Sequence, residues 1–412
     1  MDETGSEEDN MSRPLKITSN NREITDPKKI VLSHFANQGQ TTIPELSKEL
    51  NISVPKVTLL VNELIDEKYI LDYGKIESSG GRRPNLYGVA PESAFFIGVD
   101  VKQNHLNIGL SDLDKNLVKV EEKLEFTLDN TQESLDQLCN SIHYFISSSG
   151  IQKDKIKGIG INLSGRINYA TGNSYSYFYF EEKPLSQVVE QRIGIPVYLE
   201  NDSRAMAYGE FCMGVVENEK DVLFLNLDYG IAVGVLMNGQ LYYGKSGYAG
   251  EFGHMPFFDN ELICRCGKKG CLETQASGWA LEQRFREKLA NGSSSLLTVT
   301  RKLSPASIHM EEIIDAANHD DVLAIELIAE IGEHLGRGIA ALINIFNPEL
   351  VVLGGAMMAT GEYIWLPVKT AINKYSLSLV NNDTQIKIST MGERAGILGA
   401  CLLVRNRALG LV

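Results

Sequence analysis

The sequence predicts an α/β protein of two lobes, preceded by a small N-terminal unit that is mostly helical. From Ser93 onward, strand-like stretches are followed by alternating helical and strand-like stretches, and this order occurs twice. Repetition of one α/β unit predicts two lobes that face each other across a cleft. Before Ser93, apolar residues recur at helical spacing in three short segments. A chain of 412 residues is also too long for one ordinary core.

Residues 1–25 are polar, mixed in charge and nearly free of large apolar side chains. Such a composition cannot bury enough apolar surface to fold alone. We therefore expect a disordered tail that becomes partly helical near Ile24.

Residues 26–78 predict a winged helix-turn-helix. The segments PKKIVLSHFANQ, IPELSKEL and VPKVTLLVNELIDEK have helical spacing, and a turn at residues 51–53 separates the last two. Thr41 or Thr42, and Ser53, stand where the second and third helices begin, so we expect them to be caps. Residues 69–77 and 86–90 could form the strands of a wing, and residues 79–94 contain the linker with GGRRP. The alternative is a plain three-helix bundle.

The charge distribution favours DNA binding by this unit. The whole chain has a net charge of −14, which argues against a protein coated in nucleic acid. Residues 10–90, however, hold 11 Lys/Arg against 9 Asp/Glu. Paired arginines on a glycine hinge can enter a minor groove or hold phosphates, although in a linker they are more often solvated charge. The candidate DNA-contacting residues are Thr42, Val54, Pro55, Lys56, Thr58, Asn62, Arg82 and Arg83.

A cluster of cysteines predicts a metal site in the second half of the chain. Cys264, Cys266 and Cys271 fall within eight residues, and His254 lies ten residues before the first of them. Thiolates and imidazole are the ligands that zinc prefers, and four of them close a tetrahedral structural site. Such a site has no open position for water, so we predict structural Zn²⁺ rather than a hydrolytic centre. The alternatives are a redox pair or three buried thiols beside an unrelated histidine.

Two carboxylates flank this cluster. Glu251 precedes the histidine by three residues, and Glu273 follows the last cysteine by two. A metal that fixes His254 would place both carboxylates beside one pocket. The alternative is that both are ordinary surface charges.

The remaining bulk features indicate a cytoplasmic protein. No apolar run approaches the length of a membrane span, and no signal-peptide pattern is visible at the start. Cys139, Cys212 and Cys401 are scattered, which suits a reducing compartment.

Taken together, these motifs resemble the ROK family (repressors, uncharacterised open reading frames and sugar kinases), and within it the sugar-responsive transcriptional regulators. The resemblance extends from Asp26 to the C-terminus. The matching pieces are the helix-turn-helix, GGRRP, IGVD at 97–100, END at 200–202, GEFGH, CRCGKKGCLE, NPELVVLGG at 347–355 and AGILGA. The resemblance implies an actin-like ATPase fold over residues 95–412. One lobe would comprise residues 95–211 with the C-terminal helix, and the other residues 212–394.

The resemblance also implies a sugar site, formed by Asn201, Asp202, Glu251, His254 and Glu273. The chemistry agrees, because a carboxylate can accept hydrogen bonds from two neighbouring sugar hydroxyls. Zinc on one nitrogen of His254 would fix its tautomer and leave the other nitrogen free to face the sugar. The alternative for Asp202 is a helix N-cap, since SRAMAYGEF follows it directly.

The phosphate loops separate a sensor from a kinase. In the family's kinases Asp202 would be the general base, and glycine-rich loops let the backbone approach ATP. Here Lys102, Gln103 and Asn104 stand in the first loop, and Asp228-Tyr229-Gly230 in the second, while Gly354-Gly355 is intact. We interpret the chain as a non-enzymatic regulator whose nucleotide site is lost. A sugar kinase, and a regulator controlled by a partner protein, are the alternatives.

The resemblance implies the partners as well. Two helix-turn-helix units of a homodimer or homotetramer would bind the half-sites of operator DNA. A monosaccharide or a sugar derivative would be the effector.

Overall fold

The computed structural model describes residues 18–19, 22–23, 26–75, 84–180 and 182–411. Within the tail, Thr18–Ser19 (β1) pairs antiparallel with Arg22–Glu23 (β2). The predictions for the rest of the tail, including Ile24, lie outside the described residues. In the part of the chain that is described, no helix combines the length and apolarity that crossing a membrane requires.

The N-terminal unit is three helices and a small sheet, as the periodicity predicts. The turn between the second and third helices starts at Asn51, whose φ of 51° is left-handed, a conformation that asparagine tolerates. Val57, Val61 and Leu64 bury the inner face of the third helix, against the first two. The strands order as β3-β5-β4, and β4 pairs antiparallel with β5 as a wing. The elements are α1 (Pro27–Gln38), β3 (Thr41–Thr42), α2 (Ile43–Leu50), α3 (Val54–Asp66), β4 (Ile70–Lys75) and β5 (Asn85–Val89).

The helix caps correct two predictions. Thr42 caps α2: its hydroxyl accepts the Glu45 N–H, and the Glu45 carboxylate accepts the Thr42 N–H in return. Thr42 is 3% exposed, so the prediction that it contacts DNA is wrong because its polar groups are used inside the unit. Ser53 holds the N-cap position of α3, but its side chain makes no capping hydrogen bond.

The first lobe is a five-stranded sheet of order β12-β9-β6-β7-β8. Its first three strands are antiparallel, and β9 and β12 add parallel to them through crossover helices. The elements are η1 (Pro91–Ser93), β6 (Phe95–Val101), β7 (His105–Asp112), β8 (Leu117–Glu125), α4 (Gln132–Ser148), η2 (Lys153–Lys155), β9 (Ile156–Leu163), β10 (Ile167–Asn168), β11 (Asn173–Ser174), α5 (Leu185–Ile193), β12 (Val197–Asn201) and α6 (Asp202–Met213).

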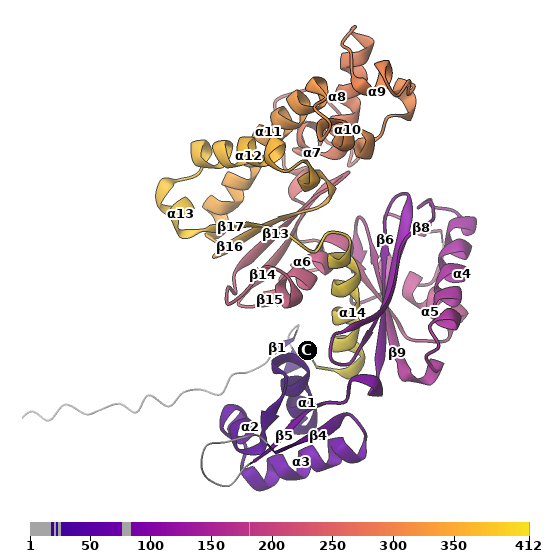
Figure 1. The fold of residues 1–412 in the computed structure, drawn as a ribbon, viewed down its shortest axis with the longest axis vertical. Helices are drawn as coiled ribbons and strands as arrows, with labels where there is room; N and C mark the ends of the chain where they lie inside the picture. The colour runs from indigo at the N-terminus through magenta and orange to yellow at the C-terminus, as the bar shows by residue number, and fades with distance from the viewer. Residues whose placement is uncertain (1–17, 20–21, 24–25, 76–83, 181, 412) are drawn as a thin grey trace, which may run out of the picture.

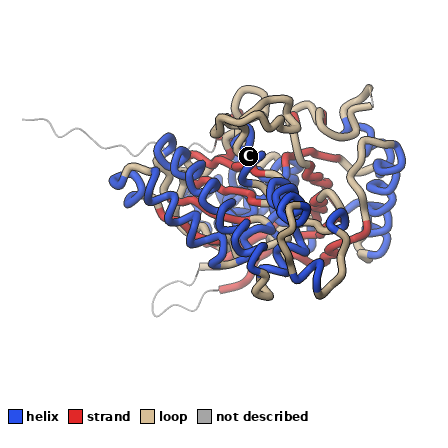
Figure 2. Tube along the Cα trace, turned by 90° about the horizontal axis from the view of Figure 1, so that it is seen from above, coloured by secondary structure: helices blue, strands red, loops and turns tan. Residues whose placement is uncertain are grey.

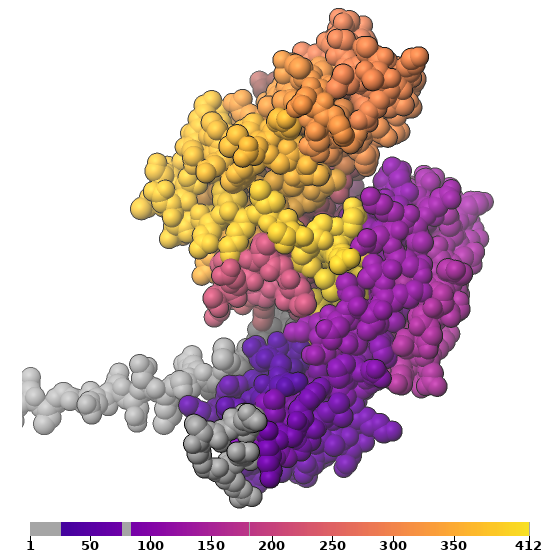
Figure 3. Space-filling model, in the orientation of Figure 1, coloured from indigo at the N-terminus to yellow at the C-terminus, as the bar shows by residue number. Residues whose placement is uncertain are grey.

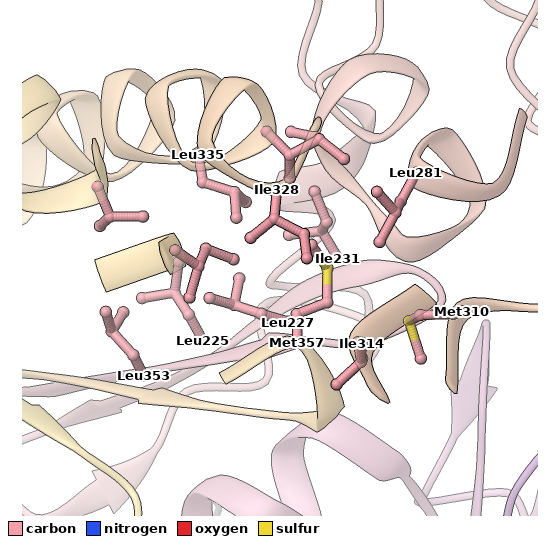
Figure 4. Packing of buried hydrophobic residues seen from close by; sticks show 14 of the residues in the cluster. Leu225, Leu227, Ile231, Leu281, Met310, Ile314, Ile328, Leu335, Leu353 and Met357 are labelled. Carbon is pink, nitrogen blue, oxygen red and sulfur yellow. The ribbon is translucent and has the colours of Figure 1, made fainter. Parts of the chain in front are cut away.

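The second lobe repeats this plan with a sheet of order β15-β14-β13-β16-β17. Asn238-Gly239 turn the β14–β15 hairpin with φ of 51° and 74°, as the Asn-Gly pair predicts. In its core, Ile328 and Leu335 of one long helix lie over Leu225 and Leu353 of the sheet (Figure 4). The elements are β13 (Val222–Leu227), β14 (Ile231–Met237), β15 (Gln240–Leu241), η3 (Phe252–His254), α7 (Glu273–Ala276), α8 (Gly278–Ala290), α9 (Leu296–Val299), η4 (Pro305–Ser307), α10 (Met310–Ala317), α11 (Val322–Phe346), β16 (Leu350–Gly354), η5 (Ala356–Thr360), α12 (Glu362–Tyr375), α13 (Ser378–Asp383) and β17 (Gln385–Ile388). The last helix, α14 (Arg394–Leu409), packs on strands β6, β7 and β9 of the first lobe.

Helices α6 and α14 pack against each other between the two sheets (Figure 1). Glycines make this packing close: a Cβ at Gly399 would lie 1.8 Å from the carbonyl oxygen of Ala205. Seen from above, helices flank the strands of both lobes (Figure 2). The space-filling view shows a hollow where the orange second lobe meets the purple first lobe (Figure 3).

The C-terminal end of α14 also holds the N-terminal unit. Arg405 is 2% exposed, and its guanidinium donates to the carbonyl oxygen of Ala36 (3.0 Å) and to Asn37 Oδ1 (2.6 Å) at the end of α1. Ser33 of α1 donates to the Leu411 carbonyl at 3.0 Å. A helix C-terminus carries partial negative charge, so a buried arginine is favourable there. The helix between the lobes is therefore also the attachment of the N-terminal unit.

Candidate functional site

The cysteine loop between η3 and α7 folds back on itself tightly. Cys264 N–H donates to the Lys268 carbonyl, and Gly267 N–H donates to the Cys264 carbonyl, each at 2.8 Å. Gly270 has a φ of 72°, and a Cβ there would lie 2.1 Å from the carbonyl oxygen of Phe258. Glycine is therefore required at this turn.

The fold brings all four predicted metal ligands together. One donor atom from each of His254, Cys264, Cys266 and Cys271 lies within 4.8 Å of the others. His254 Nδ1 is 3.5 Å from Cys264 Sγ, and Cys266 Sγ is 3.6 Å from Cys271 Sγ. A tetrahedral zinc with bonds of about 2.0–2.3 Å would hold neighbouring ligand atoms roughly 3.5–3.8 Å apart. The cluster could therefore hold a metal ion of this size.

The second nitrogen of His254 points to the neighbouring carboxylate. His254 Nε2 lies 3.7 Å from Glu251 Oε2. The Glu251 side chain is 46% exposed, so it stands at the rim of the site. Gly253 lets the GEFGH turn lie against β14, because a Cβ there would meet the Ile231 carbonyl oxygen at 2.4 Å.

Glu273 is buried, which makes the surface-charge alternative wrong for this residue. Its exposed fraction is 5%, and its Oε2 accepts the Ile231 N–H at 3.2 Å. Arg265 holds the carboxylate with two groups, Nε at 3.0 Å from Oε1 and a terminal nitrogen at 3.3 Å from Oε2. The sequence interpretation missed Arg265. Arg265 stands between Cys264 and Cys266, and this position could have indicated a role in the site, because a metal that fixes both cysteines also holds the residue between them.

Asn201 and Asp202, the other two predicted sugar-site residues, lie in the first lobe, where β12 passes into α6. Asn201 is the N-cap of α6, with Oδ1 accepting the Arg204 N–H at 3.2 Å. Asp202 is the first helical residue, so the N-cap alternative for it is wrong. Its Oδ2 accepts a hydrogen bond from the Ser164 hydroxyl at 2.6 Å, and its Oδ1 accepts the Ser203 N–H at 2.7 Å. The sequence analysis did not predict the contact of Ser164 with Asp202.

A buried ion network fixes the backbone directly before this pair. Glu200 is 2% exposed and accepts from Arg204 Nε at 2.8 Å and from Arg407 at 2.5 Å. Burial alone would raise the pKa of Glu200, but the two arginines outweigh burial and lower it. Tyr243 of the second lobe donates to the same carboxylate at 3.0 Å. One carboxylate thus joins β12, the second lobe and α14.

Tyr177 lies in the first lobe, in the segment that follows β11. Its hydroxyl donates to Gln103 Oε1 at 3.3 Å. Burial raises the pKa of Tyr177, with Arg265 of the second lobe opposing the rise and Asp202 of the first lobe adding to it. A charged group from each lobe therefore acts on the same hydroxyl.

The predicted recognition face lies on the outer side of α3. Val54 is 47% exposed, and Pro55, Lys56 and Asn62 are exposed with it, whereas Thr58 is half-buried. The Thr58 hydroxyl donates to the Val54 carbonyl at 2.8 Å. Sequence interpretation missed Leu59, which is 58% exposed on the same helix. Leu59 follows Pro55 by four residues, and this spacing places both residues on the same face of the helix, which the sequence could have indicated. Arg82 and Arg83 lie outside the described residues.

This combination defines a class of protein: two α/β lobes, a His/Cys cluster that could hold a metal, and a helix-turn-helix unit in front. The ROK family profile matches residues 96–407, and the chain belongs to the ROK family.

Three similar proteins bear on the function. The xylose repressor of Bacillus subtilis (strain 168) is 27% identical over 390 residues, covering 93% of this chain and 96% of the repressor. A crystal structure of a ROK family transcriptional regulator, a homolog of the E. coli MLC protein, has a TM-score of 0.78 at 25% identity, covering 93% of this chain and 96% of that chain. A ROK family glucokinase from Streptomyces griseus, solved with glucose and AMPPNP, has a TM-score of 0.67 at 27% identity, covering 76% of this chain and 100% of that chain. The two matches over 93% of the chain necessarily extend into the N-terminal unit.

Proposed function

We propose that this protein is a sugar-responsive transcriptional repressor. The observation that carries the proposal is the similarity to a xylose repressor over 93% of the chain, helix-turn-helix included. The interlobe site supports a sugar as effector, because Asn201, Asp202, Glu251 and Glu273 offer amide and carboxylate groups to neighbouring hydroxyls. His254 Nε2, on the side away from the cysteines, would add a fifth polar group.

The metal in this proposal is zinc, held by His254 and the three cysteines. Four protein ligands leave no position for a reacting water, so its contribution is to fix the loop. Zinc on Nδ1 of His254 would set the orientation of Nε2. It would also hold Arg265, and through it Glu273, in place.

The DNA contacts would come from α3, with Val54, Pro55, Lys56, Thr58 and Asn62 toward the major groove. Leu59 adds an apolar side chain that could contact a thymine methyl group. Arg82 and Arg83 would add phosphate or minor-groove contacts. A homodimer would place two such units on the half-sites of a palindrome.

Helix α14 offers a physical route from sugar to DNA. Arg407 near its end donates to Glu200, one residue before Asn201, at 2.5 Å. Arg405, two residues earlier, holds the last turn of α1. A sugar that favours a different angle between the lobes would move α14 and so the N-terminal unit. Operator affinity would then change by linkage.

Sugar is expected to weaken DNA binding in a way that depends on Asp202. The operator would first be selected from a random pool of DNA duplexes, and its affinity then measured with and without a panel of pentoses and hexoses that includes xylose and glucose. We expect at least one sugar to weaken binding roughly tenfold, the lower range of allosteric coupling. Asp202→Asn should keep DNA binding and lose the response.

Lys56→Ala is the reciprocal control. It should weaken DNA binding and leave sugar binding unchanged, because Lys56 lies on the exposed face of α3. If no sugar changes the affinity of the parent protein for its selected DNA, the effector role is wrong.

The residues that stand in the phosphate loops argue against the kinase alternative. Lys102 Nζ lies 3.3 Å from Asp100 Oδ2, with the lysine side chain 14% exposed and the aspartate side chain 0%. Burial alone would lower the pKa of Lys102, but the surrounding carboxylates, with Asp100 first, raise it. A charged side chain therefore occupies a loop where kinases present bare backbone to phosphate. Gly355, the intact remnant, has a folding role: a Cβ there would lie 2.4 Å from the Leu227 carbonyl oxygen.

ATP consumption is expected to stay at background with every sugar in the panel. The measurement is coupled ADP release, with a ROK glucokinase assayed in parallel as the positive control. Turnover above about 1 s⁻¹, the low end for enzymes, would contradict the regulator proposal.

A further inference from the structure

Four exposed tyrosines lie on two loops, one loop in each lobe. Tyr175 is 51% exposed and Tyr179 61%, and both follow β11 in the first lobe. Tyr242 is 49% exposed and Tyr248 39%, in the second-lobe loop that leads to Glu251. Single exposed aromatic rings are ordinary on protein surfaces, but exposed rings that meet across two lobes are candidates for contact with a ligand or a partner.

Two of these rings meet across the lobes. The centroids of Tyr175 and Tyr248 are 6.3 Å apart, with their planes at 76°. Tyr248 precedes Glu251 by three residues, and the carbonyl oxygen next to it, on Gly247, accepts from Arg204 at 2.8 Å. The pair therefore sits at the junction that also carries the start of α6.

Tyr175 is tied by backbone bonds to the loop that supports Asn201 and Asp202. Its N–H donates to the Arg166 carbonyl at 3.0 Å. Two residues back on that loop, Ser164 donates to Asp202, and the Gly165 carbonyl accepts from Asn201 Nδ2 at 3.1 Å. The backbone of Tyr175 thus adjoins the loop that supports Asn201 and Asp202, while Tyr248 lies three residues before Glu251 on the second lobe.

The two regions differ in the part of a sugar that they can hold. The inner residues are carboxylates, an amide and an imidazole, which bind the hydroxyl groups around one ring. Exposed tyrosines offer flat apolar faces with a hydroxyl at one end, which suit the C–H face of a pyranose. A single monosaccharide held by the inner residues would leave these faces open to water.

Resting on the proposed function, we propose that the effector is a glycoside of at least two sugar units. Its first ring occupies the site of Asn201, Asp202 and Glu273. Its second ring lies against Tyr175 and Tyr248, which form an outer subsite. The tyrosines then set the length of the effector, and the inner residues set its stereochemistry.

The test is calorimetric titration of the full-length, metal-loaded protein with matched sugar pairs. The pairs are xylose with xylobiose, glucose with cellobiose, and N-acetylglucosamine with its β-1,4 dimer. In one pair the disaccharide should bind at least about tenfold tighter than the monosaccharide, the effect of one or two aromatic contacts. Tyr175→Ala and Tyr248→Ala should each remove about three- to tenfold of that gain, leaving the monosaccharide affinity within about twofold.

Two variants act as controls. Tyr175→Phe keeps the apolar face and should keep the disaccharide gain. Tyr144→Ala removes a more exposed tyrosine, 67% exposed on α4, and should change neither affinity.

Three outcomes would overturn the proposal. A monosaccharide that binds as tightly as its disaccharide, and still releases DNA, would leave the repressor role intact and remove the outer subsite. Alanine variants that change sedimentation without changing sugar affinity would assign the tyrosines to a contact between copies of the chain. If no sugar of any length binds, the effector role and the outer subsite both fail.

Discussion

Cys264→Ser is expected to release the metal, lower stability sharply and abolish sugar binding together. The loop that carries Cys264, Cys266 and Cys271 is joined to the Met255–Phe258 segment by backbone bonds at Gly270 and Leu272, and to the rest of the site by the metal ligands and Arg265. Zinc binding supplies on the order of 10 kcal/mol in small zinc domains. Because the second lobe has its own apolar core, we expect a smaller loss here, about 5 kcal/mol, with a fall in melting temperature on the order of 10 °C.

Metal content by mass spectrometry under native conditions and thermal unfolding check this result. Cys212→Ser is the matched control, since Cys212 is a free cysteine outside the cluster. It should keep one zinc per chain. A parent protein that contains no zinc, or whose melting temperature ignores a chelator, would contradict the assignment of the cluster.

Arg405→Met is expected to separate sugar binding from the DNA response. The substitution keeps side-chain volume but leaves the Ala36 carbonyl and Asn37 Oδ1 without their buried donor. Loss of bonds to a charged donor should cost about 2–4 kcal/mol. This cost is offset in part because the substitution also removes a buried charge to which no carboxylate of the described residues is hydrogen-bonded. Sugar and DNA should each still bind. The fold-change in DNA affinity on adding sugar should shrink toward one.

Thermal unfolding and DNA titrations with and without sugar measure the two parts separately. Arg394→Met is the matched control on the same helix, because Arg394 is 64% exposed and contacts only Glu122 in the described part of the chain. It should preserve both stability and response. If Arg405→Met responds to sugar as the parent does, α14 is not the route.

The local sequence pattern was sufficient to predict the metal-ligand cluster and the helix-turn-helix of this protein. The cysteine spacing predicted a four-ligand cluster because its ligands, apart from His254, sit on one short loop. The helix-turn-helix followed from apolar spacing and from Thr42, whose capping partner Glu45 is three residues away. Such interactions join near neighbours in the chain, so a single sequence displays them.

The sequence pattern could not assign a role where the same residue could either cap a helix or bind a ligand. Thr42 could cap a helix or contact DNA, and Asp202 could be an N-cap or a ligand. Burial and backbone angle decide such cases. The structure gave capping to Thr42 and to Asn201, which left the Asp202 carboxylate with Ser164 and the interlobe space.

The sequence alone therefore established the family resemblance, the alternation of strands and helices in two lobes, and the residues able to bind a metal, because each rests on spacing along the chain. Tertiary packing was needed to pair Arg265 with Glu273, to bury Arg405 against α1, and to bring Tyr175 onto Tyr248. The last two contacts join residues that lie 73 to 369 positions apart. No local preference encodes such partners; they meet because the two lobes and the N-terminal unit are packed around α6 and α14.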